Sequence, residues 1–390
     1  MGQHCFFYSE CESEASILIP STKMPLCSVH FIKYTENRVW KMIDGPSLLK
    51  SKSKEKILVA LSGGKDSQAL LYILDALFHK RIQIEGLYIN LHIEENDYSS
   101  DSLRMAQKLC EQLGIPFHSI DVFEVQGYGI DDLYLLKERI KNKESNSNRE
   151  KEFISRGECS FCGEAKRYYI NKFAIENGFT RVVTGHNLDD EATKFLQNLL
   201  SMNLFLISRS GPIVDSKEEN VVPRIKPFYY ISEQEIALYC YLKSIAHVET
   251  ECPYSKTPVT KFKYVLHEID AIQQGAIFGL MKKYQKVLKP VLQKSLDELN
   301  PPVRCSVCGM ISSWKKCAHC KTNQFVSKYL DIPCKSKIKN HETTDEMDKD
   351  DDEEGFDVDQ FDFDGVPMNQ TDFSHCYFED IEDEEKNDEF

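Results

Sequence analysis

Apolar and polar positions alternate with two different periods along the central part of the chain. Short apolar runs of strand length occur at Ile57–Leu61, Ile84–Leu91, Phe117–Val122 and Thr180–Thr184. Segments with apolar residues at helical spacing lie between these runs, for example at Ser102–Leu113 and Ala165–Asn177. Strand runs that alternate with helical patterns are typical of a parallel sheet covered by helices. The pattern therefore predicts an α/β fold over residues 54–250.

The charge is distributed unevenly along the chain. The 390 residues have a formal net charge of −14 at pH 7, but residues 341–390 contain 22 Asp and Glu against two Lys. Residues 1–340 therefore contain 46 Lys and Arg against 40 Asp and Glu, a net charge of +6. We expect a mildly basic folded body and a disordered acidic tail over residues 340–390, because so acidic a segment cannot bury enough apolar surface to fold.

The apolar runs also bear on location. No run reaches 18 apolar residues, and no signal-peptide core follows Met1. These observations predict a cytoplasmic protein that does not associate with membranes. The 14 cysteines then favour metal binding over a disulfide scaffold.

The string Ser62-Gly63-Gly64-Lys65-Asp66-Ser67 lies between the first apolar run and a helical pattern. Glycines let backbone N–H groups point into one concavity, and a helix N-terminus adds partial positive charge. Lys65 supplies a further cation. The common pattern G-x-x-x-x-G-K-[ST] does not fit, because position 59 is Val and Asp66 follows the lysine. The string predicts a phosphate site of another class, with an ordinary strand–helix corner as the alternative.

A regular set of metal-type ligands lies near the C-terminus. It consists of two CxxC pairs with eight residues between them: Cys305, Cys308, Cys317 and Cys320. Four thiolates at this spacing suit a closed tetrahedral zinc site. We predict one structural Zn²⁺ here.

A second, less regular set lies near the N-terminus. Cys27 and His30 form a knuckle with two residues between them, whereas Cys5 and Cys11 are more widely spaced. We predict a second zinc ion bound by Cys5, Cys11, Cys27 and His30, and leave open whether His4 replaces Cys5.

A third group of cysteines differs in kind. Cys159 and Cys162 form a CxxC pair without a second pair nearby, and the next candidates are Cys240 and Cys252. Three thiolates would leave a metal with an open coordination position. The spacing alone is equally compatible with an incomplete zinc knuckle or a redox dithiol.

Two motifs together resemble a known family. Residues 62–67 resemble the PP-loop of N-type ATP pyrophosphatases, and the segment CSFCGEAKRYYINKFAIENGFTRVVTGHNLDDEA (159–192) resembles the tRNA 2-thiolation branch of that superfamily. This branch includes the T-loop and archaeal uridine thiolases and the cytosolic wobble-uridine thiolase. The similarity runs from residue 5 to about residue 325, and the motifs LYINL and GHNLDDEA are closer to the T-loop and archaeal members. It implies a tRNA-uridine 2-sulfurtransferase.

The resemblance and the pattern together imply a parallel-sheet PP-loop ATP pyrophosphatase domain flanked by N- and C-terminal zinc modules. The expected parts are an N-terminal zinc module (1–45), a catalytic ATP-binding domain with the iron–sulfur site (46–254), a basic helical tRNA-binding segment (255–300), a C-terminal zinc ribbon (301–330) and the acidic tail (340–390).

The resemblance also implies roles around the nucleotide. The loop at 62–67 would hold the ATP phosphates. Tyr88, Ile89 and Asn90 would contact the adenine, and Gly185 would pack on the nucleotide. His92 occupies a position where the family commonly has glycine, which could alter that contact.

Further roles concern the reaction itself. Cys159, Cys162 and Cys252 match the three ligands of a [4Fe-4S] cluster, which leaves one iron open for a sulfur ligand. Cys240 falls outside the match and is expected to be a core thiol. Lys166 matches an active-site lysine. Asp189 and Asp190 match paired acids near the reaction centre, with helix capping as the structural alternative for such acids.

The implied reaction has two steps. The carbonyl oxygen at carbon 2 of the uracil attacks the α-phosphate of ATP and pyrophosphate leaves, after which sulfur attacks carbon 2 and AMP leaves. The loop amides, Lys65 and Mg²⁺ would stabilise the pyrophosphate charge, and Lys166 the α-phosphate. Asp66 would orient Lys65 or the metal, and Asp189 or Asp190 would act as base or metal ligand.

The expected cofactors are ATP, Mg²⁺, one [4Fe-4S] cluster and two Zn²⁺. The expected partners are tRNA, a ubiquitin-like thiocarboxylated sulfur carrier protein and a second copy in a homodimer. For tRNA we expect basic and aromatic residues to meet phosphates and splayed bases, with a solvated helical face as the alternative. These residues are Lys256, Lys261, Lys263, Lys282, Lys283, Lys286, Lys289, Tyr254, Phe262, Tyr264 and Tyr284.

Some features depart from the family pattern, and some choices stay open. The family's first knuckle is usually CxxC, but Tyr8 occupies the expected place and Cys5 lies three residues upstream. The acidic tail has no counterpart. The sequence does not distinguish the T-loop from the wobble uridine as target. Competing functions are another PP-loop tRNA-modifying or amide-forming ligase, and a non-catalytic zinc-rich RNA-binding adaptor.

Overall fold

The computed structural model describes residues 4–6, 11–44, 55–143, 146–214, 221–255, 258–296 and 303–330. The acidic tail, Tyr8 and Lys256 lie outside the described residues, so the predictions made for them stay predictions. Within the described part of the chain, no helix is long and apolar enough to cross a membrane.

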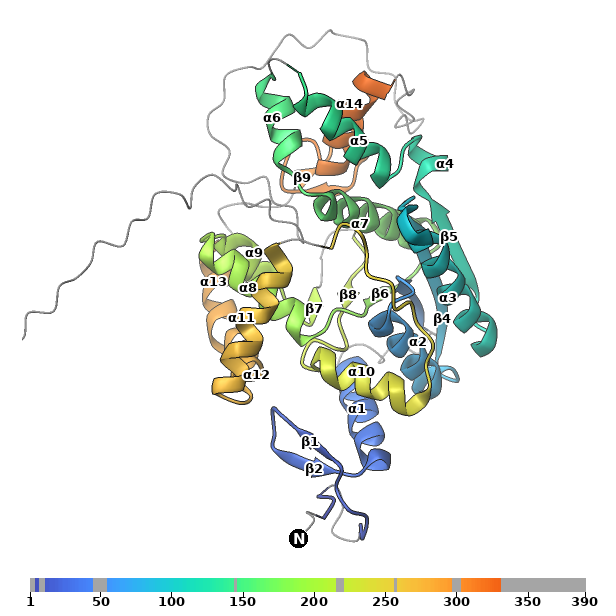
Figure 1. The fold of residues 1–390 in the computed structure, drawn as a ribbon, viewed down its shortest axis with the longest axis vertical. Coiled ribbons are helices and arrows are strands. Elements are labelled where there is room, and N and C mark those ends of the chain that lie inside the picture. Colours follow the sequence, from blue (N-terminus) through green and yellow to red (C-terminus); the bar gives the residue numbers. More distant parts are fainter. Residues whose placement is uncertain are drawn as a thin grey trace, which may run out of the picture.

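A six-stranded sheet forms the centre of the molecule (Figure 1). Its strands are β3 (Glu55–Leu61), β4 (Ile82–Asn90), β5 (Phe117–Asp121), β6 (Arg181–Thr184), β7 (Ile213–Val214) and β8 (Arg224–Ile225). They lie in the order β5-β4-β3-β6-β8-β7, and every pair is parallel except β7 with β8. The predicted parallel-sheet α/β fold is confirmed. The strand order reverses at β3, and open sheets of this kind bind ligands at the carboxyl ends of strands at such a point.

Helices cover both faces of the sheet because alternate residues of β3 point to opposite sides. Ile57 and Val59 belong to one core, which lies under α1 (Ser28–Ile43), α2 (Lys65–Phe78), α3 (Tyr98–Leu113) and α10 (Glu233–Lys243). Leu58 belongs to the opposite core, which α5 (Ile130–Lys141), α6 (Asn148–Ser155), α7 (Glu158–Glu176) and α14 (Ala318–Leu330) cover. The short elements η1 (Glu95–Asp97) and α4 (Val122–Gln126) connect strands to these helices.

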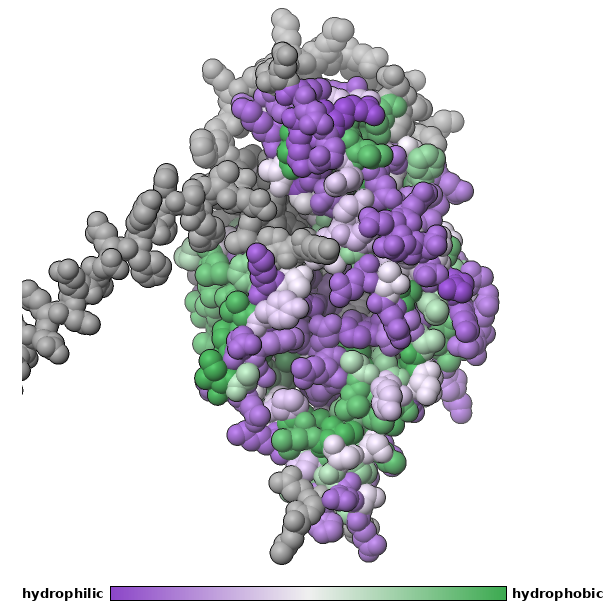
Figure 2. All heavy atoms as spheres, viewed as in Figure 1, coloured by the Kyte–Doolittle hydropathy of each residue, from purple (hydrophilic) through white to green (hydrophobic). Residues whose placement is uncertain are grey.

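A helical bundle stands beside the sheet with a core of its own (Figure 1). It comprises α8 (Leu188–Leu200), α9 (Leu204–Arg209), α11 (Pro258–Ile272), α12 (Ala276–Lys283), the π-helical turn η2 (Tyr284–Leu288) and α13 (Lys289–Leu296). Apolar residues gather on its outer side, which is green in Figure 2. The exposed apolar residues of the bundle include Ile272, Val287 and Val291. The helices α11 to α13 occupy the segment for which a helical, lysine-rich pattern predicts helices.

A small hairpin followed by a helix forms each terminal module. At the N-terminal end, β1 (Ile17–Ile19) pairs with β2 (Met24–Leu26) ahead of α1. At the C-terminal end, β9 (Val303–Arg304) pairs with β10 (Ile311–Ser312) ahead of α14. The two modules lie at opposite ends of the molecule (Figure 1). Each hairpin and helix brings one of the terminal sets of cysteines together.

Candidate functional site

The loop between β3 and α2 has the shape that its glycines require. Gly63 has φ +75°, and a Cβ there would lie 2.5 Å from the carbonyl oxygen of Ser102. Gly64 is the N-cap of α2, which starts at Lys65. The Oγ of Ser67 donates to the carbonyl of Gly64 at 3.0 Å. The loop is therefore a closed turn ahead of a helix N-terminus, the place where backbone amides bind phosphate.

A methyl group at Gly63 is expected to destabilise the fold strongly. Gly63→Ala meets backbone atoms of Ser102 and adopts a left-handed φ, so we expect a loss of more than about 3 kcal/mol in the free energy of unfolding. Gly114 is a matched control, because its φ is +65° and nothing lies within 4 Å of an added Cβ. Gly114→Ala should cost about 1 kcal/mol. Urea unfolding measures both; equal losses would contradict the close packing at Gly63.

Gly185 lies directly against the loop. It follows β6, and a Cβ there would be 3.0 Å from the carbonyl carbon of Asp66 and from the amide nitrogen of Ser67. A side chain at this position would push the loop out of place. The structure thus brings the TGHN motif beside the PP-loop, as the resemblance implies; a direct contact of Gly185 with nucleotide stays a prediction.

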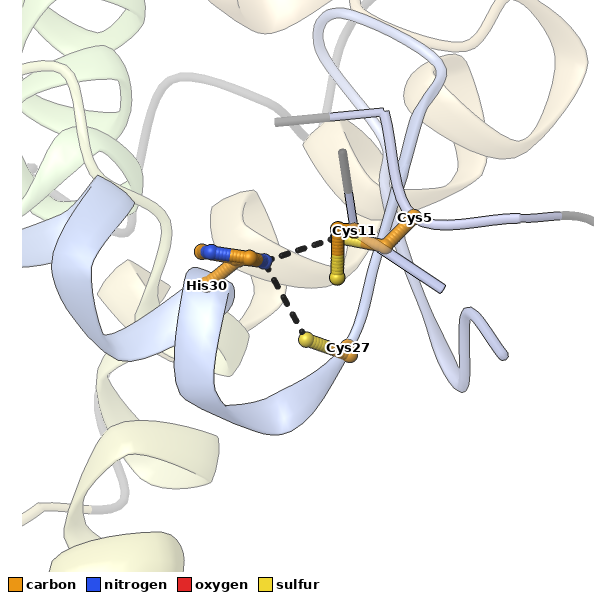
Figure 3. A group of neighbouring side chains, drawn as sticks. All are labelled: Cys5, Cys11, Cys27 and His30. Atoms are coloured by element: carbon orange, nitrogen blue, oxygen red, sulfur yellow. Dashed lines mark hydrogen bonds between the residues drawn. The ribbon is translucent and has the colours of Figure 1, made fainter. Parts of the chain in front are cut away.

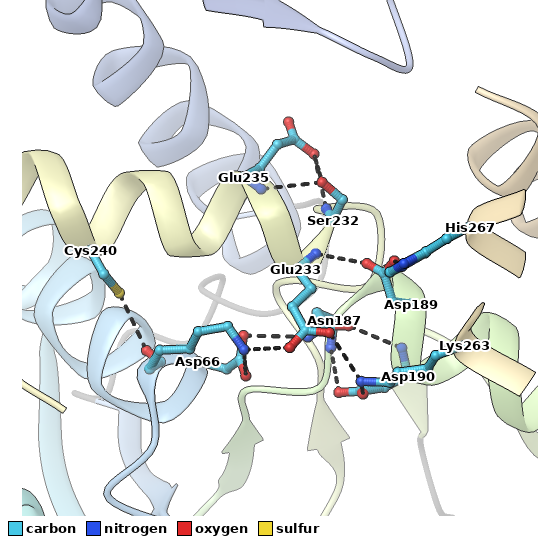
Figure 4. Close-up of polar contacts among 11 residues, drawn as sticks. Asp66, Asn187, Asp189, Asp190, Ser232, Glu233, Glu235, Cys240, Lys263 and His267 are labelled. Carbon is cyan, nitrogen blue, oxygen red and sulfur yellow. Dashed lines mark hydrogen bonds and ion pairs between the residues drawn. The ribbon is translucent and has the colours of Figure 1, made fainter. Parts of the chain in front are cut away.

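Charged side chains from four helices meet beside the loop (Figure 4). The Nζ of Lys65 lies 2.5 Å from Glu233 Oε1 and 3.4 Å from Asp66 Oδ2. The Nζ of Lys263 lies 3.1 Å from Glu233 Oε2 and 2.7 Å from Asp190 Oδ1. Sequence reasoning missed Glu233 as a site residue. The capping-box pattern Ser-Glu-Gln-Glu marks a helix start there, but nothing in it points to Lys65.

Two acidic groups of this network, Asp66 and Asp190, differ in proton affinity. Burial raises the pKa of Asp66 to about 6, although the Lys65 ammonium opposes this shift. Burial also acts to raise the pKa of Asp190, but Lys263 and His186 outweigh it and the pKa is lowered. Neighbouring carboxyl groups whose pKa values are driven apart suit separate acid–base or ligand roles.

Asp189 and Asp190 have different environments although they are adjacent. Asp189 is buried and accepts hydrogen bonds from the backbone N–H of Glu233 at 2.7 Å and from His267 Nε2 at 2.8 Å. Asp190 accepts from the backbone N–H of Asn187 in a capping box and pairs with Lys263. The N-cap of α8 is Asn187, so neither acid is the N-cap itself. Asp190 is the acid that contacts the charged network, whereas Asp189 joins three helices.

The third cysteine group converges on the start of α7. Cys159, Cys162 and Lys166 lie on its first turns at a spacing that places them on one face. Burial raises the pKa of Cys162, the Lys166 ammonium opposes this, and the thiols of Cys159 and Cys252 raise it further. The Cys159 thiol also donates to the carbonyl of Tyr254 at 3.5 Å, so the segment that carries Cys252 lies at the start of α7.

The three cysteines of this group are not drawn together as closely as the two terminal sets. In the described part of the chain, two sets of ligand atoms lie within 4.8 Å of one another, and Cys159, Cys162 and Cys252 are not among them. Ligands of one zinc ion must all reach the same atom, about 2.3 Å away. Ligands of a cluster bind separate irons and need not meet at one atom. A [4Fe-4S] cluster at these three residues stays a prediction.

Tyr254 supports the loop that carries Cys252. Its hydroxyl donates to Asp131 at 2.7 Å, its ring contacts Tyr134, and its carbonyl accepts from the Cys159 thiol at 3.5 Å. The expectation that Tyr284 stacks on RNA bases is wrong, because Tyr284 is buried and bonds to Ser210. Tyr254 is likewise engaged within the protein.

The N-terminal metal set is assembled around His30 (Figure 3). Ligand atoms of Cys5, Cys11, Cys27 and His30 all lie within 4.8 Å of one another. The Nδ1 of His30 is 3.2 Å from Cys5 Sγ and 3.4 Å from Cys27 Sγ. His4 is exposed and outside this set. The set therefore contains Cys5, and the irregular spacing of the first pair does not prevent the ligands from meeting.

The C-terminal set is compact and buried. Its four sulfur atoms lie within 4.8 Å of one another: those of Cys305, Cys308, Cys317 and Cys320. The Sγ atoms of Cys308 and Cys317 are 3.7 Å apart, and Gly309 turns the first knuckle with φ +71°. Four free thiols at this distance fit a tetrahedral ion with Zn–S bonds of about 2.3 Å. Zinc occupancy of both terminal sets stays a prediction.

The side chains at the end of β4 are engaged within the protein, and their contact with adenine stays a prediction. Tyr88 is buried and donates to the carbonyl of Ser99, and Ile89 lies in the opposite core. The amide of Asn90 donates to Asp121 at 3.0 Å. His92 has φ +53°, which explains why glycine suits this position, and its ring contacts Asp121 at 2.6 Å. Cys240, expected to be a core thiol, is buried and contacts the carbonyl of Lys65.

Comparison with known proteins matches these features. A family model described as a PP-loop domain matches residues 37–257. The tRNA-5-methyluridine(54) 2-sulfurtransferase of Pyrococcus horikoshii is 36% identical over 316 residues, which cover 80% of this chain and 91% of that protein. The cytoplasmic tRNA 2-thiolation protein 1 of Chlamydomonas reinhardtii is 30% identical over 312 residues, 79% of this chain and 81% of that protein.

A solved structure agrees with the sequence relatives. The U34-tRNA thiolase NcsA from Methanococcus maripaludis, with its [4Fe-4S] cluster, matches with a TM-score of 0.66 at 25% identity. The match covers 85% of this chain and 98% of that chain. The matched region includes far more than the PP-loop domain alone.

Proposed function

Because this chain belongs to the PP-loop family, in the branch of the tRNA 2-sulfurtransferases and tRNA 2-thiolation proteins, we propose that it replaces oxygen 2 of a tRNA uridine with sulfur at the expense of ATP. Family membership confirms the resemblance inferred from the motifs. One observation carries the proposal for this chain: the segment leading to Cys252 is bonded to the PP-loop itself, through Val248 N–H and the carbonyl of Gly63 at 3.0 Å. This hydrogen bond connects the phosphate loop to the segment that leads to the three-thiol site, which consists of Cys159, Cys162 and Cys252.

The activation step uses the loop and its lysines. The uracil oxygen at carbon 2 forms a bond to the α-phosphorus, the bond between the α-phosphorus and its bridging oxygen breaks, and pyrophosphate leaves. Loop amides and Lys65 stabilise the charge that grows on pyrophosphate, and Lys166 neutralises the α-phosphate. Asp66 and Asp190 supply carboxylate oxygens of the kind that Mg²⁺ prefers.

The sulfur step completes the exchange without redox chemistry. Cys159, Cys162 and Cys252 would hold a [4Fe-4S] cluster, which would supply an open iron position for sulfide. Sulfide sulfur forms a bond to the activated carbon 2. The carbon–oxygen bond breaks and AMP leaves with that oxygen. Uridine, ATP and sulfide therefore give 2-thiouridine, AMP and pyrophosphate, with no electrons left over. Lys166 follows the cluster ligands along α7, so it can serve both the α-phosphate and the incoming sulfide.

We assign tRNA binding to the exposed side of the helical bundle. Lys261, Lys282, Lys283 and Lys286 are exposed on α11 to η2, and the ring of Tyr264 is exposed among them. Basic side chains there can contact phosphates and the ring can stack on an unpaired base. The proposal also includes a thiocarboxylated carrier protein as sulfur donor, a homodimer and a cytoplasmic location. The location is supported by the algal relative, which is a cytoplasmic tRNA 2-thiolation protein.

Release of AMP tests the proposal against the two competing functions. Anaerobically prepared protein should release both pyrophosphate and AMP from ATP only when unmodified tRNA and sulfide are added together. An amide-forming ligase would require a different acceptor, and an RNA-binding adaptor would release neither product. AMP formation that does not depend on tRNA, or none at all with the cluster loaded, would overturn the assignment.

The acidic tail lies outside the described residues, and its effect on RNA binding can be measured directly. The tail carries a charge of −20 and the body +6, so a tethered tail can compete with RNA for the basic surface. Tethering keeps its effective concentration at roughly the millimolar level. Truncation after Lys339 should tighten binding of non-specific RNA at low salt, and the difference should shrink as salt rises. Unchanged affinity at low ionic strength would contradict competition by the tail.

A further inference from the structure

Glu233 is the central member of a chain of four alternating charges. One of its carboxylate oxygens accepts from Lys65 at 2.5 Å, and the other accepts from Lys263 at 3.1 Å. Lys263 continues to Asp190 at 2.7 Å. The chain Lys65–Glu233–Lys263–Asp190 thereby joins the starts of α2, α10 and α8 to α11 (Figure 4). We call these four residues the ion chain.

The ion chain is charge-balanced and faces partly into solvent. The four side chains are between 24% and 31% exposed. Burial acts to lower the pKa of Lys263 and Lys65, but the adjacent carboxylates raise both, so both lysines stay charged. The backbone of Glu233 is fixed by the hydrogen bond that its N–H donates to Asp189. The carboxylate is therefore held at one place while the two ammonium groups approach it from different helices.

Phosphate binding must disturb this arrangement. Lys65 belongs to the phosphate loop, and its ammonium is bonded to Glu233 rather than directed to a free position. When anionic phosphates bind the Lys65 ammonium, the Glu233 carboxylate loses one of its two cationic partners. It then lies close to the negative charge of the phosphates, which repels it. Lys263 is the one cation of the ion chain that then remains on Glu233. Its second bond, to Asp190, anchors that cation to α8.

We propose that Glu233 is a positioning residue that holds Lys65 until nucleotide phosphates displace it, and that Lys263 restrains Glu233 away from those phosphates. The inference rests on the proposed function in that ATP is the nucleotide. It assigns a role in ATP binding to α11, a helix of the proposed tRNA surface. Lys263 acts through Glu233 and not on ATP.

A double-mutant cycle on ATP affinity tests this inference. ATP binding to the full chain is measured by calorimetry without tRNA or sulfide. Glu233→Gln leaves Lys65 only the longer contact with Asp66, at 3.4 Å, and should tighten ATP binding about threefold to tenfold. Lys263→Gln removes the cation that holds Glu233 away from the phosphates, so Glu233 keeps its bond to Lys65. This change should weaken ATP binding by a similar factor. In the double variant, Lys263→Gln should change the ATP Kd by less than about twofold, because the Glu233 carboxylate through which Lys263 acts is absent.

Matched controls distinguish the effect of losing a contact in the ion chain from the effect of changing the net charge of the protein. Lys151→Gln and Glu268→Gln make the same changes of charge at exposed positions on α6 and α11, and each should alter the ATP Kd by less than about twofold. Lys263→Arg keeps the cation and should bind ATP nearly as the wild type does, which also provides a folded variant if a glutamine substitution destabilises the protein.

The outcomes are distinguishable. The effects of Glu233→Gln and Lys263→Gln on ATP affinity could simply add in the double variant. Additive effects would indicate long-range charge effects without contact, so they would overturn the inference and leave the proposed function intact. The inference would also fail if Glu233→Gln weakened ATP binding. Absence of ATP binding by the wild-type protein would overturn the proposed function, and this inference with it.

Discussion

Cys252→Ala is expected to abolish tRNA thiolation and the iron–sulfur absorbance while leaving two zinc ions bound per chain. Cys252 belongs to the three-thiol site at the start of α7, and the two terminal sets each contain four ligands of their own. Two cysteines cannot hold a cluster that needs three, whereas the zinc sets lose nothing. Iron, sulfide and zinc analysis of anaerobically reconstituted protein measures all three quantities.

Cys240→Ala is the matched control for this prediction. Cys240 is a buried thiol that contacts the carbonyl of Lys65 and takes no part in the three-thiol site. Its removal should leave iron content unchanged and cost stability of the order of 1 kcal/mol through lost packing. Full activity of Cys252→Ala in air, or zinc at all three cysteine groups of the wild type, would contradict the assignment.

Lys166→Ala is expected to lower the rate of adenylation by roughly 10²-fold to 10³-fold with little change in ATP affinity. Lys166 lies near the three thiols, and the proposed function has its ammonium stabilise the charge that develops at the α-phosphate. Lys65→Ala should weaken ATP binding and pyrophosphate release together, because Lys65 is the first residue of α2 at the loop. Single-turnover measurement of adenylate formation at saturating ATP separates the two effects.

Lys172→Ala provides the control for the helix. Lys172 lies six residues further along α7, near His319 of the C-terminal module. The same loss of a cation from the same helix should leave adenylation within about twofold of wild type. If Lys166→Ala also kept its turnover at saturating ATP, the role assigned to Lys166 would be wrong.

The sequence predicted the sheet and the loop because both leave a local signal. Residues 57–61 of β3 form an unbroken apolar run, and Gly63 approaches the backbone of Ser102 too closely to leave room for a side chain. The strands β7 and β8 were missed, since two residues leave no pattern. The N-terminal metal set shows the reverse case: its spacing is irregular, yet the hairpin β1–β2 brings the ligands together.

The charged site was only partly predictable, because its side chains come from segments that are distant in sequence and leave no local pattern. Glu233 and Lys65 are 168 residues apart in sequence, and no periodicity reports such a pair. Cys252 was assigned through resemblance, because spacing alone left Cys240 equally eligible. Tyr284 was placed on the wrong side of its helix, since a lysine-rich helix with aromatic residues does not reveal which ring faces the core.

Mass spectrometry of tRNA nucleosides tests the central claim most directly. Anaerobic protein with a loaded cluster is incubated with unmodified tRNA, ATP and sulfide, and the thiolated nucleoside is mapped to its position in the tRNA. The account predicts one 2-thiouridine per AMP formed, at a single position in the T-loop or at the wobble base, and none with Cys252→Ala. AMP formation without any 2-thiouridine, or sulfur incorporated equally well by Cys252→Ala, would contradict the account.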